Sequence, residues 1–195
     1  MKRGNRTLSI TYCALGAALM AVCAMISIPA AIPFTLQTFA VFFLLRFLGG
    51  ADSLKALAVY CALGAVGLPV FSGMKGGVGA LFGATGGYIL GFFFPALLLL
   101  LFEKLALRGA LPYILSAALG LLLCYAFGTA WFMVVFAGKS SPMALSKALS
   151  LCVTPFILPD AAKAALGLML GARLKKIIHP SSTGTQGAPR HPQDR

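Results

Sequence analysis

Long apolar stretches are the feature that most restricts what this chain can fold into. The first runs from about Leu8 to Ile28, and others of similar composition follow as far as residue 176. A helix that crosses a bilayer needs about 20 mostly apolar residues. Of the 195 residues, 59% are apolar and 10% are charged, whereas soluble domains have about 45–50% and about 25%. The sequence therefore excludes a soluble globular domain and predicts an all-α membrane protein.

Interruptions between the apolar stretches divide the chain into six predicted membrane crossings. Pro29 and Pro33 mark the first interruption, because proline ends helices, and Asp52 or Ser53 is expected to cap the third helix. The first stretch is longer than the core of a signal peptide, which has about 7–15 apolar residues, so we expect it to be retained. The spans are expected at about 8–28, 34–48, 54–68, 88–102, 111–136 and 155–176, with a short amphipathic piece at about 143–153.

The distribution of basic residues predicts the orientation of these spans. Ten Lys and Arg near the spans fall on the side of the two termini and three on the other side, so the positive-inside rule puts both termini of a multi-pass cell-membrane protein in the cytoplasm. We expect residues 1–7 to be a basic N-terminus and residues 8–176 to be the membrane domain. Residues 177–195 are expected to form a disordered tail, because they are polar and carry no apolar periodicity. The three residues on the outer side are Lys75, Lys139 and Lys147.

The segment 67–87, GLPVFSGMKGGVGALFGATGG, is rich in glycine but too apolar for a solvated linker. Irregular backbone at membrane depth is tolerated only where it packs against protein or lines a cavity. We therefore expect an ordered loop on the outer side, folded over the mouth of the bundle.

A charged pair interrupts the last apolar stretch. Asp160 and Lys163 are three residues apart, so on a helix they share one face, and Pro159 suits the first helical position. Each charge would cost at least about 2.5–3.5 kcal/mol in lipid, so both must face the bundle interior or a cavity. The pair is either a structural ion pair or a ligand site. An acceptor-only carboxylate beside a three-donor ammonium suits a ligand with N–H donors and a carbonyl or carboxylate.

Further polar and aromatic residues are expected in the same outer half. Gln37 lies one turn into the second span, Thr85 ends the Gly-rich loop and Tyr88 opens the fourth span. With Phe71 and Phe34 they would line a mostly apolar pocket with a few polar anchors, as in many small-molecule sites. Alternatively, Tyr88 belongs to an interfacial aromatic belt, and Gln37 bonds across helices.

Small residues follow one another along the first span. Ala14 and Ala18, and likewise Ala17 and Ala21, are four residues apart, a spacing that lets another helix approach closely. The neighbour is either a helix of the same bundle or a partner subunit.

The apolar part of the sequence lacks the residues of most catalytic sites. The two histidines of the chain, His179 and His191, both lie in the tail, so no metal site of the HExxH type is expected. The sequence also contains no GxxxxGK[ST] phosphate loop. We expect no catalytic residues, no metal, no cofactor and no nucleic-acid partner. A small-molecule binder or carrier in contact with membrane lipid is favoured over an enzyme.

Several linked motifs resemble the biotin transporter BioY family. They are TLQTFAVF at 35–42, GLPVFSG at 67–73, GGVGALFGATGGYILGF at 76–92 and the PD-x-x-K sequence that begins at Pro159. Members of this family are substrate-capture subunits, or S components, of energy-coupling factor transporters. The chain departs from the family pattern at Ala84, where a proline is usual, and at Met74-Lys75, where small residues are commoner.

The resemblance implies a six-helix S-component bundle that captures biotin from outside with high affinity. It also implies a transmembrane coupling subunit, docked on the alanine-rich face of the first helix, and a pair of cytoplasmic ATPases as partners. Asp160 would accept from the ureido N–H groups of biotin and Lys163 would bond a ligand oxygen. Gln37, Thr85 and Tyr88 would assist, and Phe71 would pack on the apolar ring. The alternatives are an S component for another small vitamin and a non-transport bundle with a structural Asp–Lys pair.

Overall fold

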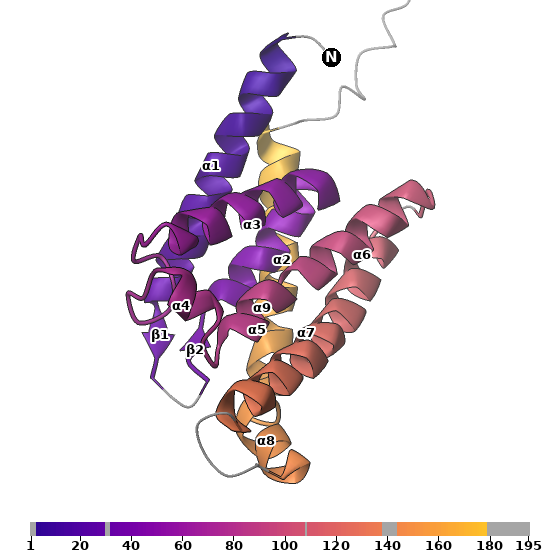
Figure 1. The fold of residues 1–195 in the computed structure, drawn as a ribbon. Helices are drawn as coiled ribbons and strands as arrows, with labels where there is room; N and C mark the ends of the chain where they lie inside the picture. The colour runs from indigo at the N-terminus through magenta and orange to yellow at the C-terminus, as the bar shows by residue number, and fades with distance from the viewer. Residues whose placement is uncertain (1–2, 30–31, 108, 138–143, 179–195) are drawn as a thin grey trace, which may run out of the picture.

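The computed structural model describes residues 3–29, 32–107, 109–137 and 144–178. These residues form nine helices and two short strands (Figure 1). In chain order the elements are α1 (Arg3–Met25), β1 (Ser27–Ile28), β2 (Phe34–Thr35), α2 (Gln37–Leu48), α3 (Gly50–Ala65), α4 (Val78–Leu81), α5 (Gly86–Gly91), α6 (Phe93–Lys104), α7 (Leu111–Ala137), α8 (Leu145–Cys152) and α9 (Ile157–Ile178). The predicted all-α membrane fold is confirmed.

The lengths of the apolar helices bear on the number of membrane crossings. Segments 7–25, 86–104 and 111–137 are long and apolar enough to span a bilayer, and α8 with α9 passes the same test as one span bent by 42°. Helices α2 and α3 have only 12 and 16 residues, fewer than the about 20 that a straight crossing needs. The total of six crossings stays a prediction.

The helices form one elongated bundle. α2 packs along α9, α1 packs along α3, and α7 packs against α5 and α6. Figure 1 shows the start of α1 and the end of α9 at the same end of the bundle, and the β1–β2 hairpin, α4 and α8 at the other end. Helix α9 continues through Ile178, two residues into the segment predicted as tail, and residues 179–195 lie outside the described part of the chain.

The second predicted span begins later than the sequence suggested. Phe34 and Thr35 belong to β2, which pairs with β1 in antiparallel register, Ser27 opposite Thr35. Helix α2 starts only at Gln37. Proline at position 33 has no N–H to donate to a helical turn, so the chain extends before it turns into α2.

The predicted cap of the third helix is wrong. Helix α3 begins at Gly50, and Gly49, with a φ of +87°, occupies the cap position three residues before Asp52. The carboxylate of Glu103 in α6 accepts from the Gly50 N–H, with both oxygens 3.2 Å away. Asp52 instead pairs with Lys55 at 2.6 Å. A remote carboxylate thus supplies the acceptor that was expected from a local side chain.

Helix α9 also starts earlier than expected. It begins at Ile157, so Pro159 is its third residue instead of its first. A proline there still lies in the first turn, where it breaks no hydrogen bond inside the helix.

The small residues of α1 divide between two faces. Ala17 is 2% exposed and belongs to the core of the bundle, and Ala21 packs against that core. Gly16 fits between α2 and α3, since a Cβ on it would lie 3.0 Å from the side chain of Ala56. Ala17 is therefore enclosed by its own bundle, which agrees with the alternative that its neighbour is a helix of the same bundle. Ala14 and Ala18 are exposed.

Close backbone contact joins α9 to α2. A Cβ on Gly167 would lie 2.6 Å from the carbonyl oxygen of Phe39 and 2.9 Å from the backbone nitrogen of Phe43, and one on Gly171 would lie 2.7 Å from the Phe43 carbonyl oxygen. Only a residue without a side chain permits this approach, a usual role of glycine between membrane helices. The contact fixes the part of α9 that carries the charged pair.

Gly167→Ala should therefore lower the stability of the bundle. The added methyl group would press on α2 backbone, and overpacking of this kind costs about 1–3 kcal/mol. The measurement is the melting temperature of the purified chain in detergent, with Gly79→Ala as the control, since a Cβ on Gly79 meets no atom within 4 Å. Equal melting temperatures for the two variants would contradict the close packing of α9 on α2.

Candidate functional site

A buried ion pair lies at the start of α9. Lys163 Nζ is 2.5 Å from Asp160 Oδ1, and the two residues are only 8% and 5% exposed. Removing two charges from water costs several kcal/mol each, and their attraction offsets this cost only with good geometry and further hydrogen bonds. The structure supplies such bonds to both side chains.

Each member of the pair has a second partner from another part of the chain. The hydroxyl of Tyr125 in α7 donates to Asp160 Oδ2 at 2.8 Å. Lys163 Nζ donates to the backbone carbonyl of Thr35 in β2 at 2.9 Å and lies 3.9 Å from the centre of the Phe34 ring. Asp160 also lies in the first turn of α9, where the helix dipole favours a negative charge. Three elements thus hold the pair in one geometry.

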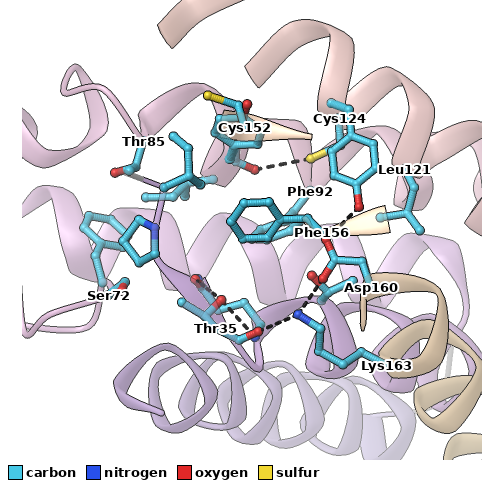
Figure 2. A pocket seen from close by; sticks show the side chains of 18 of the residues that line it. Thr35, Ser72, Thr85, Phe92, Leu121, Cys124, Cys152, Phe156, Asp160 and Lys163 are labelled. Carbon is cyan, nitrogen blue, oxygen red and sulfur yellow. Dashed lines mark hydrogen bonds and ion pairs between the residues drawn. The ribbon is translucent and has the colours of Figure 1, made fainter. Parts of the chain in front are cut away.

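The pair borders a pocket. Its lining includes residues of α2, the Gly-rich segment, α5, α7, α8 and α9. Figure 2 shows Asp160 and Lys163 on one side of this space and Ser72 and Thr85 on the opposite side. The ion pair therefore has a hollow beside it, although both residues are themselves buried.

Six of the seven residues predicted from the sequence line this one pocket, whereas Phe34 contacts Lys163 but is not part of the lining. They come from α2, from the Gly-rich segment, from α5 and from α9, which lie far apart in the chain. The six are Gln37, Phe71, Thr85, Tyr88, Asp160 and Lys163. Their meeting in one place is a result of the tertiary structure.

The polar atoms of Gln37 are occupied by other residues of the chain. Its Oε1 accepts from the Thr35 hydroxyl at 3.1 Å, and its Nε2 donates to the Tyr60 hydroxyl at 2.8 Å. Tyr60 in turn donates to the Val70 carbonyl at 3.1 Å. Gln37 therefore links α2 and α3 to the Gly-rich segment, which agrees with the alternative that it bonds across helices.

Tyr88 faces the bundle. Its hydroxyl lies 2.9 Å from Thr129 Oγ1 of α7, and its ring packs so closely on Gly128 that a Cβ there would overlap it. This placement inside the bundle argues against a role for Tyr88 in an interfacial aromatic belt. Phe71 is 2% exposed and meets the ring of Tyr60 edge-on at 5.4 Å between centroids.

Several residues of the pocket were not predicted. Tyr125 bonds the carboxylate of Asp160 from 35 positions away, but nothing in its uniformly apolar surroundings marks it as a partner. Lys75 was expected only in the outer loop, yet it lines the pocket together with Ser72. Cys124 also lines it.

The pocket combines a polar end with largely aromatic and aliphatic walls. A carboxylate oxygen and an ammonium lie side by side at the polar end, and Phe71, Phe92 and Phe156 contribute to the walls. Such an arrangement suits a small ligand whose polar group carries both N–H donors and an acceptor oxygen and whose remaining surface is apolar.

Known proteins share both the sequence and the fold. The chain is 40% identical to the biotin transporter BioY of Thermotoga maritima over 82% of its own length and 91% of that protein. It is 36% identical to the probable biotin transporter BioY of Pyrococcus horikoshii, with 85% and 95% covered. A crystal structure of the S-component for biotin from an ECF-type ABC transporter superposes with a TM-score of 0.76 at 25% identity, covering 90% of this chain and 95% of that one.

The family profile agrees with these relatives. It matches residues 1–180, which include every helix described above. On this evidence the chain belongs to the BioY family.

Proposed function

We propose that this chain captures biotin on the outer side of the membrane and acts as the S component of an energy-coupling factor transporter. The observation that carries the proposal is the buried pair of Asp160 and Lys163, which opens into a pocket. The names of the relatives, biotin transporters, support the same ligand, as does the structural similarity to an S-component for biotin.

Biotin matches the chemistry of the pocket. Its ureido ring carries two N–H groups and a carbonyl, its thiophane ring is apolar and its valerate chain ends in a carboxylate. Asp160 Oδ1, which has no partner besides Lys163 among the described residues, accepts from a ureido N–H, and Lys163 donates to a ligand oxygen. Phe71 packs on the apolar ring.

The other predicted residues assist. Thr85 and Tyr88 offer hydroxyl groups along the wall. Gln37 acts mainly through Thr35, to whose hydroxyl it is bonded, because the Thr35 carbonyl accepts from Lys163.

Transport requires partners in this proposal. The chain has no phosphate-binding loop, so ATP hydrolysis falls to a separate pair of cytoplasmic ATPases that act through a transmembrane coupling subunit. Ala14 and Ala18 are exposed on α1 and form the flat surface on which the coupling subunit docks. The excess of basic residues on the side of the termini favours a cytoplasmic location for both ends.

A purely structural ion pair is the second candidate, and one observation favours it. Both charges already have protein partners, Tyr125 for Asp160 and Thr35 for Lys163. Under this alternative, neutralising Asp160 lowers the stability of the bundle without changing the binding of any ligand.

Asp160→Asn separates the two candidates. Loss of the acceptor charge should weaken biotin binding about 10-fold or more, since an unpaired buried polar group costs about 1–3 kcal/mol and more when charged. Equilibrium binding of labelled biotin to the purified chain provides the measurement, and Asp52→Asn, which removes a carboxylate far from the pocket lining, is the matched control. If the unmodified chain does not bind biotin, the proposed function is wrong; if Asp160→Asn binds as well as the unmodified chain, Asp160 is not part of the site.

Tyr125→Phe tests whether the hydroxyl of Tyr125 positions the carboxylate of Asp160 for ligand binding. Tyr125 holds Asp160 in position, and the variant keeps the charge of Asp160 while it loses one hydrogen bond, whose typical net contribution is about 0.5–1.5 kcal/mol, so biotin affinity should fall about 3- to 10-fold, less than in Asp160→Asn. Tyr113→Phe on the same helix is the control, because Tyr113 stacks on Arg46 away from the pocket. An affinity unchanged from that of the control would show that Tyr125 does not position Asp160 for binding.

Uptake of radiolabelled biotin tests the dependence on partners. Cells that express the chain with a coupling subunit and ATPase pair should accumulate biotin, and an inactive ATPase pair should abolish the accumulation. Ala18→Leu should reduce uptake without changing binding, because the larger side chain disturbs docking. Leu122→Phe, at a position 63% exposed on α7, is the control, and equal uptake by both variants would argue against docking at Ala18.

A further inference from the structure

A tight turn within the Gly-rich segment carries a second group of polar side chains. Phe71 N–H donates to the Lys75 carbonyl at 3.0 Å, and Lys75 N–H donates to the Phe71 carbonyl at 3.3 Å. Gly73 and Met74 between them both have positive φ, 71° and 57°. The turn thus folds back on itself and pairs Lys75 directly with Phe71.

Phe71 fixes this turn to the bundle. Its ring packs against Gly64 of α3, where a Cβ would overlap it, and against Tyr60. The N–H of Gly77 also donates to the Gly64 carbonyl at 2.7 Å. Because Phe71 is almost completely buried and Lys75 is exposed, the turn holds a buried aromatic anchor and presents a lysine at the pocket.

Lys75 has no carboxylate partner in the part of the chain that the structure describes. The described acids are engaged elsewhere: Asp160 with Lys163, Asp52 with Lys55, and Glu103 with the Gly50 N–H. The charged residues that line the pocket are Asp160, Lys163 and Lys75, two positive charges against one negative. The lining therefore matches a ligand that carries one negative charge.

Ser72 adds a second donor on the same turn. It lines the pocket, and its hydroxyl is buried without a hydrogen-bond partner among the described residues. Leaving such a group unpaired is unfavourable, and an acceptor atom on the ligand would remove that cost. Figure 2 shows Ser72 across the pocket from Asp160 and Lys163.

We propose that Lys75, assisted by Ser72, holds the carboxylate of the ligand, while the Asp160–Lys163 pair holds its uncharged polar head. This inference rests on the proposed capture of biotin and assigns the two ends of the ligand. The neutral ion pair suits the neutral ureido ring, whereas a carboxylate beside Asp160 would meet a like charge. At exposed Lys75 the carboxylate keeps part of its hydration and gains a cation.

Comparison of biotin with biotinamide, which lacks the negative charge, tests the assignment. The purified full chain should bind biotin about 3- to 10-fold more tightly than biotinamide in competition with labelled biotin, a range set by the exposure of Lys75. Lys75→Gln should lose this preference by weakening biotin alone, and Lys75→Arg should retain it. Ser72→Ala should reduce it partially. Raising the salt concentration should also reduce the preference, because exposed charges are screened.

The ratio of the affinities for biotin and biotinamide does not change when a substitution only lowers the fraction of folded protein. Lys147→Gln, which removes another exposed lysine outside the pocket lining, should behave like the unmodified chain. An unchanged preference in Lys75→Gln, or an equal loss of affinity for both ligands, overturns the assignment while the capture of biotin stands. Failure of the unmodified chain to bind biotin overturns the proposed function itself.

Discussion

The ion pair between Asp160 and Lys163 is the constraint on which the site depends. Two charges in an apolar bundle are stable only when they neutralise each other and find further hydrogen bonds. Here those bonds come from the Tyr125 hydroxyl in α7 and the Thr35 carbonyl in β2. The pair therefore requires α9, α7 and the β1–β2 hairpin to meet at one point, and the pocket forms where they meet.

Close packing of α9 on α2 also holds the helix that carries Asp160 and Lys163 in place. Gly167 and Gly171 leave no room for a side chain between the two helices. In a membrane, where lipid is as apolar as leucine, helices associate through such backbone approach and through hydrogen bonds more than through burial. The same physics accounts for Gly16 and Ala17 on α1, which fit against the helices of their own bundle, and leaves Ala14 and Ala18 on an open face.

The Gly-rich segment contributes the opposite wall of the pocket. Its turn is attached to the core through the buried Phe71, whereas Lys75 in the same turn is exposed. The two ends of the pocket therefore differ in charge. The ion pair at one end is neutral overall, and Lys75 at the other end has no carboxylate partner among the described residues. In the proposed capture of biotin, this asymmetry orients the ligand with its ureido ring at α9 and its carboxylate at the turn.

The sequence alone determined the membrane fold, since the length and hydrophobicity of the apolar stretches leave no soluble alternative. It also identified Asp160 and Lys163, because charges in an apolar stretch must be enclosed by protein, and the polar and aromatic residues expected in the same outer half of the membrane completed the predicted pocket. Local sequence patterns did not predict contacts made by residues far away in the chain. Glu103 accepts from the Gly50 N–H at the start of α3, and the Tyr125 hydroxyl donates to Asp160. Only the tertiary structure brought Lys75 and Ser72 to the pocket, because hydropathy and spacing describe one segment at a time, whereas a site is made by contacts between segments.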